Sequence, residues 1–180
     1  MPLILITGIS TSGKSSIAKE LVKRGYEAHD TEHNGISAWF NKETGERAAE
    51  FGQVADRSKE WMDQHEWRMS MDWVKQKAKE ADTKTIFLCG GGANELEVRE
   101  LCDKVIWLKT DEATIRSRVN NPRDHTYGTQ PHELDRILKG NKRKEAEYQQ
   151  YGAIMVDARQ PFEKVVDEIL ARVNQQYEVN

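Results

Sequence analysis

The sequence predicts an α/β fold in which a parallel sheet of five strands lies between two layers of helices. A length of 180 residues favours a single domain spanning residues 1–180. Short apolar runs with the length of buried strands alternate along the chain with segments of helical periodicity. Near the amino terminus, residues 8–15 read Gly-Ile-Ser-Thr-Ser-Gly-Lys-Ser, which matches the pattern G-x-x-x-x-G-K-S between a strand and a helix.

The strand and helix segments follow from their apolar patterns. We expect strands at residues 3–7, 26–32, 85–89, 104–108 and 153–157. We expect helices at residues 16–24, 94–102, 111–119, 134–151 and 162–173. This alternation is typical of a doubly wound parallel sheet.

Residues 8–15 have the composition of a loop that wraps around a phosphate group. Gly8 and Gly13 permit backbone conformations that a Cβ atom would block, so successive N–H groups can turn toward one anion. The helix beginning there adds the positive end of its dipole, Lys14 reaches the β- and γ-phosphates, and the Ser15 hydroxyl can bind Mg²⁺. An ordinary Gly/Ser turn is the alternative, but it leaves the flanking strand and helix unexplained. The predicted nucleotide-binding residues here are Gly8, Ser10, Thr11, Ser12, Gly13, Lys14, Ser15 and Ser16.

Two acidic residues, Asp30 and Glu32, close the second expected strand. Ligands of open parallel sheets bind at the carboxyl ends of strands, and residues two apart in a strand point the same way. Asp30 can therefore serve Mg²⁺ or take a proton from an attacking hydroxyl, and Glu32 can bind substrate hydroxyls. Which of the two is the base stays open, and a pair of solvated loop acids is the alternative. The strand at residues 85–89 lacks the acidic end residue of a Walker B motif, which favours Asp30 for the magnesium side.

Residues 33–81 are the candidate region for binding a second substrate. Four of the five tryptophans of the chain fall in this segment. We expect residues 47–81 to be mostly helical, because their apolar residues recur at spacings of three and four. That apolar stripe consists of Trp61, Met62, His65, Met69, Trp73 and Val74. An ordinary helix packed on the sheet is the alternative to a substrate-binding insert.

Further candidates for the second substrate are glycines and arginines. Gly90, Gly91 and Gly92 follow a strand directly, which predicts that their backbone approaches a ligand closely, and a flexible turn is the alternative. Arg57 and Arg68 are candidates to bind an anionic substrate, with a plain surface position as the alternative for each.

Residues 120–133 are polar, contain two of the four prolines, and are predicted to form a mobile loop between helices. In a phosphotransferase such a loop is a candidate lid, which excludes water while the phosphoryl group is transferred. Arg116, Arg118 and Arg123 are then candidates to neutralise charge on that group.

The overall composition excludes several classes of partner. A net charge of −3 provides no basic excess for nucleic acid. The apolar start is too short for a signal sequence or a membrane span, and Cys89 and Cys102 do not make a disulfide framework. We therefore expect a cytoplasmic protein with no membrane or nucleic-acid partner. A monomer and a homodimer stay equally open.

Taken together, these motifs resemble those of the small P-loop kinases, and most of all the shikimate kinase family. The resemblance covers most of the chain and rests on four places. Residues 8–15 match the phosphate loop, and Asp30-Thr31-Glu32 resembles the family's D-T-D. Residues 90–92 resemble the glycine triplet that meets the substrate, and residues 148–157 resemble the closing Y-x-x-x-A-D-x-x-V-D. The resemblance implies the P-loop NTPase fold, a three-layer αβα arrangement, with ATP and Mg²⁺ as cofactors.

The same comparison suggests roles for further residues. Arg118 is similar to the arginine beside the adenine, Pro161 falls where the adenine is stacked, and Arg123 is similar to the lid arginine. The family's substrate-binding arginine near the closing motif aligns with Lys144, one position after Arg143, which we take as the candidate. Two departures are the Glu32 in place of an aspartate and the longer, tryptophan-rich insert.

The sequence therefore predicts an enzyme that transfers the γ-phosphoryl group of ATP, with Mg²⁺, to a small metabolite. Lys14, Asp30 and Arg123 are its candidate catalytic residues, and Ser15 and Asp30 its candidate metal ligands. A nucleoside or nucleoside-monophosphate kinase is an alternative within the same fold. A regulatory ATPase that hydrolyses nucleotide without an acceptor is an alternative of another class, against which the missing Walker B acid and the lid-like loop argue.

Overall fold

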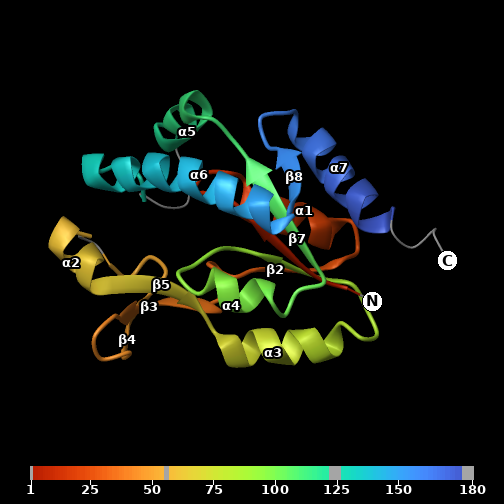
Figure 1. Cartoon of the computed structure of the whole chain (residues 1–180), viewed down its shortest axis with the longest axis horizontal. Coiled ribbons are helices and arrows are strands. Elements are labelled where there is room, and N and C mark those ends of the chain that lie inside the picture. Colours follow the sequence, from red (N-terminus) through yellow and green to blue (C-terminus); the bar gives the residue numbers. More distant parts are fainter. Residues whose placement is uncertain (1, 55–56, 122–126, 176–180) are drawn as a thin grey trace.

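The apolar runs form a parallel five-stranded sheet at the centre of the computed structural model, which describes residues 2–54, 57–121 and 127–175 (Figure 1). Its strands lie in the order β2-β6-β1-β7-β8. They are β1 (Leu3–Thr7), β2 (Glu27–Asp30), β6 (Ile86–Cys89), β7 (Lys104–Lys109) and β8 (Ile154–Asp157). All neighbours in this sheet pair in parallel, which confirms the predicted αβα fold.

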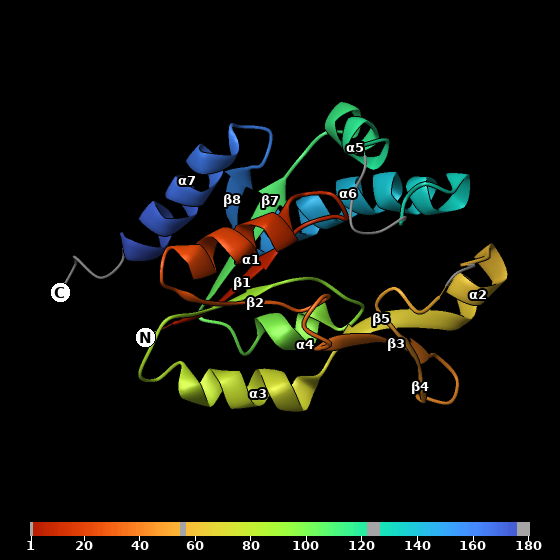
Figure 2. The same cartoon turned by 180° about the vertical axis from the view of Figure 1, so that it is seen from behind.

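One face of the sheet is covered by α1 (Lys14–Lys23) and α7 (Phe162–Asn174), which lie in front of the strands in Figure 2. Ile4 and Ile6 of β1 belong to the buried cluster that includes side chains of both helices. Successive side chains of a strand point to opposite faces, so this face receives every second residue of β1.

The opposite face is covered by α3 (Met71–Glu80), α4 (Glu95–Arg99) and α6 (Pro131–Tyr151). Leu3 and Leu5 of β1 pack into this second cluster. Because β1 is apolar at both sets of positions, all five of its residues are buried, as expected of a central parallel strand.

A smaller apolar cluster joins α5 (Glu112–Val119) to α6. Ile115 and Val119 of α5 pack against Ile137 of α6, and Ile9 of the phosphate loop packs against this cluster. The cluster thereby holds the first turns of α6 beside the phosphate loop that follows β1.

The insert differs from the prediction, because it contains a second sheet. Its antiparallel strands lie in the order β4-β3-β5 and are β3 (Ser37–Asn41), β4 (Arg47–Glu50) and β5 (His65–Met69). A single helix of six residues, α2 (Lys59–Gln64), precedes β5. The prediction of a mostly helical segment at residues 47–81 was therefore wrong, although α3 lies within it.

The apolar residues spaced three and four apart lie in α2, in β5 and in α3, so their spacing does not mark one helical segment. Ser58 and Ser70 cap α2 and α3, and their side chains accept hydrogen bonds from the N–H groups of Trp61 and Trp73. Between them the backbone is extended from His65 onward. Each serine is a helix-start signal visible in the sequence, and it outweighs the spacing of three and four.

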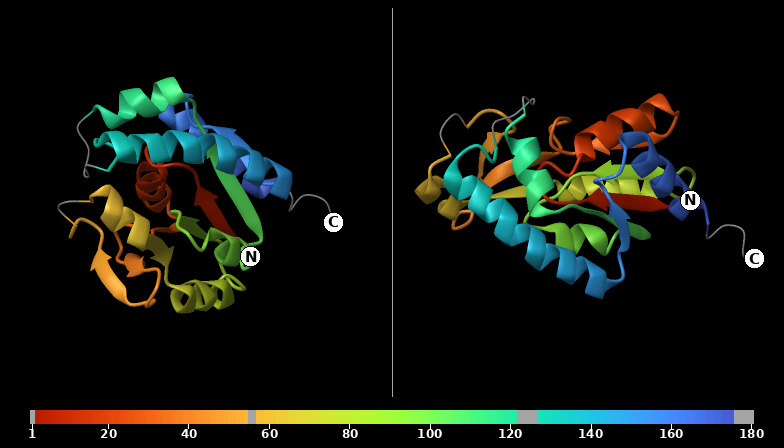
Figure 3. Two further views of the ribbon diagram at one scale, coloured as in Figure 1. Left: turned by 60° about the vertical axis from the view of Figure 1, so that its left-hand side comes forward. Right: turned by 90° about the horizontal axis from the view of Figure 1, so that it is seen from above.

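Both the insert and the first turns of α5 and α6 lie at the carboxyl ends of the parallel strands (Figures 1 and 3). This is the edge at which open α/β sheets bind their ligands. Within the described residues, none of the helices is both long enough and apolar enough to cross a membrane.

Candidate functional site

Residues 8–15 form a tight loop that leads from β1 into α1. The backbone of Gly13 is left-handed, with φ 104°, and Thr11 also has a positive φ of 77°. Gly13 is the N-cap of α1 and provides no side-chain hydrogen bond, whereas α2, α3 and α5 are capped by Ser58, Ser70 and Asp111. The first amide groups of α1 have no acceptor within their helix, so they are available to an anion.

Buried polar groups of the loop support the same interpretation. The hydroxyl oxygens of Thr11 and Ser12 are buried and have no hydrogen-bond partner in the described part of the chain. The ammonium group of Lys14 is also buried and donates to the carbonyl oxygens of Gly8 and Ile9, at 3.0 Å each. In the described part of the chain, this ammonium has two carbonyl acceptors and no carboxylate partner. Its positive charge is therefore not neutralised, which makes the loop suited to bind phosphate.

The phosphate loop opens into a cavity of about 540 Å³, the nucleotide cavity. Its wall on the far side is made by Arg118 of α5 and by Gln160 and Phe162 at the start of α7. Pro161, predicted beside the adenine, is not among the lining residues, although both of its neighbours are. The lining residues from the phosphate loop and α1 are Ser10, Thr11, Ser12, Gly13, Lys14, Ser15, Ser16 and Ile17.

Arg118 ties the phosphate loop to the opposite wall of this cavity. Its guanidinium donates to the carbonyl oxygens of Thr11 at 3.0 Å, Ser12 at 3.3 Å and Ala158 at 2.6 Å. Burial lowers the pKa of Arg118 from its ordinary value, but an arginine remains charged at any physiological pH. Arg116, by contrast, is bound to Glu112 on the exposed side of α5, and Arg123 lies outside the described residues.

The two acids at the end of β2, Asp30 and Glu32, have different surroundings. Asp30 is buried, and its carboxylate accepts hydrogen bonds from the N–H groups of Glu32 and His33, at 3.0 and 3.2 Å. Its second oxygen lies 2.8 Å from Nδ1 of His33. Asp30 lines neither the nucleotide cavity nor a second cavity that adjoins it, whereas Glu32 lines both cavities. Of the two predicted acids, Glu32 is therefore the one that faces the cavities.

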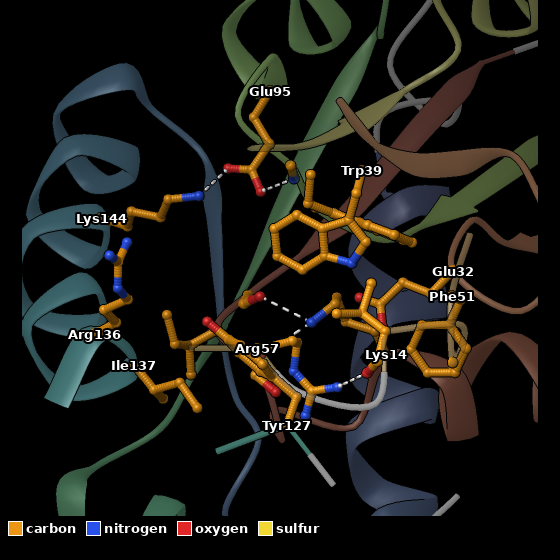
Figure 4. Close-up of a pocket in the computed structure, with 18 residues that line it drawn as sticks. Lys14, Glu32, Trp39, Phe51, Arg57, Glu95, Tyr127, Arg136, Ile137 and Lys144 are labelled. Carbon is orange, nitrogen blue, oxygen red and sulfur yellow. Dashed lines mark hydrogen bonds and ion pairs between the residues drawn. The ribbon is translucent and has the colours of Figure 1, made fainter. Parts of the chain in front are cut away.

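A second cavity, the acceptor cavity, adjoins the first and has a volume of about 470 Å³ (Figure 4). Ser10, Lys14 and Glu32 line both cavities, so the two meet at the phosphate loop. In Figure 4 the rings of Trp39 and Phe51 stand across the space from the α6 side chains. Its remaining lining residues are Gly8, Ile9, Trp39, Phe51, Gly52, Val54, Arg57, Trp67, Gly91, Gly92, Glu95, Tyr127, Arg136, Ile137 and Lys144.

The glycine triplet is required by close packing rather than by flexibility. A Cβ atom on Gly90 would overlap the buried Thr31, and one on Gly91 would overlap the carboxylate of Glu95. A Cβ atom on Gly92 would lie 2.9 Å from the carbonyl oxygen of Trp67. Gly91 and Gly92 line the acceptor cavity, whereas Gly90 does not, and the flexible turn is not needed to explain the triplet.

Glu95 is the buried centre of a polar network at the far end of this cavity. One oxygen accepts from the N–H of Gly92 at 2.9 Å and from the hydroxyl of Thr7 at 3.3 Å. The other accepts from the ammonium of Lys144 at 2.8 Å and the phenol of Tyr148 at 2.7 Å. Burial and the negative charge of Glu95 raise the pKa of Tyr148 far above its ordinary value, so the phenol remains a donor.

Of the three candidate substrate arginines, only Arg57 lines the acceptor cavity. It donates to the buried carboxylate of Glu133 at 2.7 Å and lies over the ring of Tyr127. Arg68 was a wrong candidate: its neighbour Trp67 on β5 faces the cavity, so Arg68 points to the other side, where it binds Glu66 and Glu97.

Arg143 was also a wrong candidate, because it is exposed on α6 while its neighbour Lys144 lines the cavity. Glu95, Lys144 and Tyr127 line the cavity but were not predicted to do so, whereas Trp39 and Trp67 belong to the tryptophan-rich segment predicted to bind the second substrate. Lys144 was identifiable as the position that aligns with the family arginine. Neighbouring residues of a helix point about 100° apart, so Lys144 faces the cavity and Arg143 does not. For Glu95, a signal was its place three residues after Gly92 at a helix start.

Comparison with protein-family models matches the one described as AAA domain, over residues 4–150. The chain belongs to this family. Comparison of the AAA domain protein with curated proteins finds no match. Its fold is shared with solved structures of kinases, each of which covers nearly the whole chain.

Three of these structures illustrate the likeness. Shikimate kinase from Aquifex aeolicus vf5 is 17% identical, with a TM-score of 0.55, over 99% of both chains. A gluconokinase from Sinorhizobium meliloti 1021 is 17% identical, with a TM-score of 0.53, over 98% of this chain and 97% of its own. Deoxyadenosine kinase from M. mycoides is 16% identical, with a TM-score of 0.52, over 96% and 98%. At these identities the likeness shows a common fold.

Proposed function

We propose that this AAA domain protein is a kinase that transfers the γ-phosphoryl group of ATP to a hydroxyl group of a small metabolite. The observation that carries the proposal is the shared lining of the two cavities. Ser10, Lys14 and Glu32 belong to both, so a triphosphate in one and an acceptor in the other would meet at these residues. Phosphoryl transfer depends mainly on positioning and charge stabilisation, which such a junction supplies.

Each residue at the junction has a role that fits its environment. The amides at the start of α1 and the hydroxyls of Thr11 and Ser12 would hold the phosphates. The buried ammonium of Lys14 would leave its two carbonyl acceptors and bind the β- and γ-phosphates. The carboxylate of Glu32 would orient the acceptor hydroxyl and accept its proton. Asp30, held by the turn, remains the alternative base acting through water.

The residues around the loop also fit a magnesium ion. When bound with ATP, Mg²⁺ would neutralise charge on the phosphates. The Ser15 hydroxyl lines the nucleotide cavity and would serve as a ligand. Asp30 would act through a water molecule, because hydrogen bonds already occupy its oxygens. Mg²⁺ commonly takes one or two protein groups and fills its other positions with phosphate oxygens and water.

Residues 120–133 remain our candidate for a lid over the phosphates. Residues 120–130 of this segment connect α5, which carries Arg118, to α6, which begins at Pro131 and lines the acceptor cavity. Residues 122–126 lie outside the described part of the chain. Closure of such a loop would exclude water and direct the phosphoryl group to the acceptor.

The experiment measures ADP formation by the purified protein with ATP and Mg²⁺, with and without a panel of metabolites that carry hydroxyl groups. A kinase forms ADP much faster with its acceptor, whereas a regulatory ATPase forms it at one rate throughout. Lys14→Ala should lower acceptor-dependent turnover by at least about 10³-fold, since it removes charge stabilisation in the transition state.

Lys23→Ala is the matched control, because this lysine lies on the same helix with its side chain 80% exposed. Thermal unfolding of both variants separates loss of function from loss of fold. Wild-type turnover by Lys14→Ala would overturn the proposed function.

A further inference from the structure

We propose that the acceptor is an uncharged molecule with a planar ring and free hydroxyl groups, which is the chemistry of a nucleoside. This inference rests on the proposed function and names the substrate class of the same site. Two independent features of the acceptor cavity carry it: the aromatic character of its wall, and the pairing of its positive charges with carboxylates.

The aromatic wall is built by the insert. Trp39 of β3 and Trp67 of β5 are directly opposite each other in the antiparallel pairing, so both side chains emerge on the same face of the small sheet. The ring centroids of Trp39 and Trp67 are 5.4 Å apart, and those of Phe51 and Trp67 are 6.2 Å apart. Edge-to-face packing of this kind fixes the rings in place. Trp39, Phe51 and Trp67 all line the cavity, which gives it a rigid apolar surface suited to stack a flat ring.

Tyr127 belongs to the same cavity but comes from the other side of the cleft. Its ring lies below the Arg57 guanidinium, 5.7 Å from centre to centre. Burial and the nearby charge of Glu133 raise the pKa of Tyr127 to about 12, so it presents a neutral phenol at physiological pH. Figure 4 shows Tyr127 and Arg57 at one end of the cavity and Glu95 at the other.

Apart from Lys14 at the junction, the cations that line this cavity are each paired with a carboxylate of the protein. Lys144 is paired with the buried carboxylate of Glu95 at 2.8 Å. Arg57 is paired with the fully buried Glu133 at 2.7 Å. Arg136 forms an ion pair with Asp63. A carboxylate or phosphate on the acceptor would have to compete with these built-in anions.

Glu32 adds negative charge that is not balanced in this way. It lines the cavity beside Lys14 and has no ion pair in the described part of the chain. Once Lys14 is bound to a triphosphate, the junction carries excess negative charge, which disfavours an anionic acceptor by direct repulsion. A carboxylate is, however, a strong acceptor for hydroxyl groups, such as those of a ribose.

Together these features select among the acceptors that the fold allows. A carboxylate-bearing acceptor such as shikimate or gluconate needs an unpaired cation, and so does the phosphate of a nucleoside monophosphate. An uncharged acceptor without a ring would leave the aromatic wall unused. A nucleoside satisfies both parts of the cavity, with its base against the rings and its sugar hydroxyls toward Glu32.

The first experiment measures ADP release with ATP and Mg²⁺ for matched acceptors. The panel contains adenosine, guanosine, cytidine and thymidine, the corresponding monophosphates, shikimate, gluconate and the cation choline. We expect at least one nucleoside to raise ADP release tenfold or more above its own monophosphate and above the acids. Preference for an acid, a monophosphate or choline would overturn the inference while leaving the kinase proposal intact. ADP release that no acceptor raises would instead overturn the proposed function, and the inference with it.

The second experiment tests the aromatic wall with the nucleoside found in the first. Trp39→Leu should raise the KM for the nucleoside tenfold or more and leave the KM for ATP within twofold. Trp73→Leu is the matched control, since Trp73 packs on His29 at 4.9 Å and lines neither cavity. Phe51→Leu provides a second variant should Trp39→Leu not fold. Equal nucleoside KM values for Trp39→Leu, Phe51→Leu and the wild type would overturn the inference.

The third experiment tests the charge pairing. Asp63→Asn releases Arg136 at a partly exposed site, where folding should be little affected. If the paired cations exclude anionic acceptors, this variant should turn over the corresponding monophosphate several-fold faster relative to the nucleoside. Asp135→Asn is the matched control, because Asp135 binds only the exposed Lys139 on the same helix. An unchanged ratio in Asp63→Asn would contradict the role given to this ion pair.

Discussion

The nucleotide end and the acceptor end of the cleft are built from different kinds of structure. At the nucleotide end, one contiguous segment, the phosphate loop and the first turn of α1, supplies half of the lining residues. At the acceptor end, the lining comes from the phosphate loop, the insert, the glycine triplet, α4 and α6, which are far apart in the sequence. The first surface includes the hydroxyl-bearing residues of the phosphate loop, and the second combines aromatic rings with paired charges.

This difference teaches how one fold accommodates different acceptors. A phosphate loop binds through backbone N–H groups, and its geometry depends little on side chains elsewhere in the chain. The structure of the nucleotide end is therefore set locally. The acceptor end depends on which side chain each strand and helix turns inward, and a small sheet of three strands can alter that without disturbing the parallel sheet. The two ends should accordingly respond independently to substitution.

The largest effect that we predict concerns Glu95, at the acceptor end. Glu95→Gln places an amide NH₂ group near the two donors Lys144 and Tyr148 and removes the only charge that balances the ammonium there. We expect the free energy of unfolding to fall by about 2 kcal/mol, as for other buried charge pairs that lose one partner. The KM for the acceptor should rise about tenfold, with the KM for ATP unchanged.

Chemical denaturation and steady-state kinetics measure these two effects of Glu95→Gln. Glu97→Gln is the matched control, since Glu97 lies on the same helix with 56% of its side chain exposed. A rise in the KM for ATP equal to that for the acceptor would show that the two ends are coupled after all.

The second prediction concerns Arg118, at the nucleotide end. Arg118→Ala removes three hydrogen bonds from a charged group to the carbonyl oxygens of the phosphate loop and Ala158. Charged hydrogen bonds of this kind contribute about 1.5 kcal/mol or more, so we expect ATP affinity to fall ten- to thirtyfold. Titration calorimetry with a non-hydrolysable ATP analogue measures the loss, and the acceptor KM should not change.

Arg116→Ala provides the comparison for Arg118→Ala within the same helix. The side chain of Arg116 is 51% exposed and binds Glu112 one turn away, so its loss should change ATP affinity less than twofold. Equal losses in the two variants would mean that the contacts of Arg118 with the loop contribute nothing to nucleotide binding.

The smallest predicted effect lies outside both ends and tests the sheet that supports them. The pKa of Glu27 on β2 is lowered from 4.5 to about 2, first by its hydrogen bond with Lys84 and then by that with His29. A lowered pKa in the folded state stabilises the protein above the ordinary value and ceases to do so as the pH falls from 4.5 toward 2.

Glu27→Gln should therefore cost about 1 kcal/mol at pH 7, after allowance for the partial exposure of the site. The difference from the wild type should shrink steadily below pH 4.5. Urea denaturation across this range measures it, with the exposed Glu43→Gln as control. A difference that stays constant down to pH 2.5 would contradict the ion pairing of Glu27.

Much of the nucleotide end could be predicted from the sequence because its signals are local. The G-x-x-x-x-G-K-S pattern, the apolar run before it and the helical spacing after it all lie within about 25 residues. The five strands of the parallel sheet were likewise evident as short apolar runs. The acidic pair was identified as well, although only Glu32 faces the cavities, because Asp30 caps the turn that follows β2.

The insert could be predicted as a region but not as a structure. Its apolar residues recur at helical spacing across β5 and two helix starts, and a periodic pattern carries no information about where hydrogen bonds pair strands. Pairing of β3 with β4 and β5 depends on contacts between residues 7 to 32 positions apart, which local propensity does not contain.

The sequence by itself determined the parallel sheet, the phosphate loop and the polar strand ends, since each of these follows from neighbouring residues and backbone geometry. The tertiary structure alone decided which side chains line the second cavity: Trp67 rather than Arg68, and Lys144 rather than Arg143. The physical reason is that one position along a strand reverses the face, and one along a helix turns it by about 100°. Packing against distant elements sets that rotation, and with it the chemistry of the cavity.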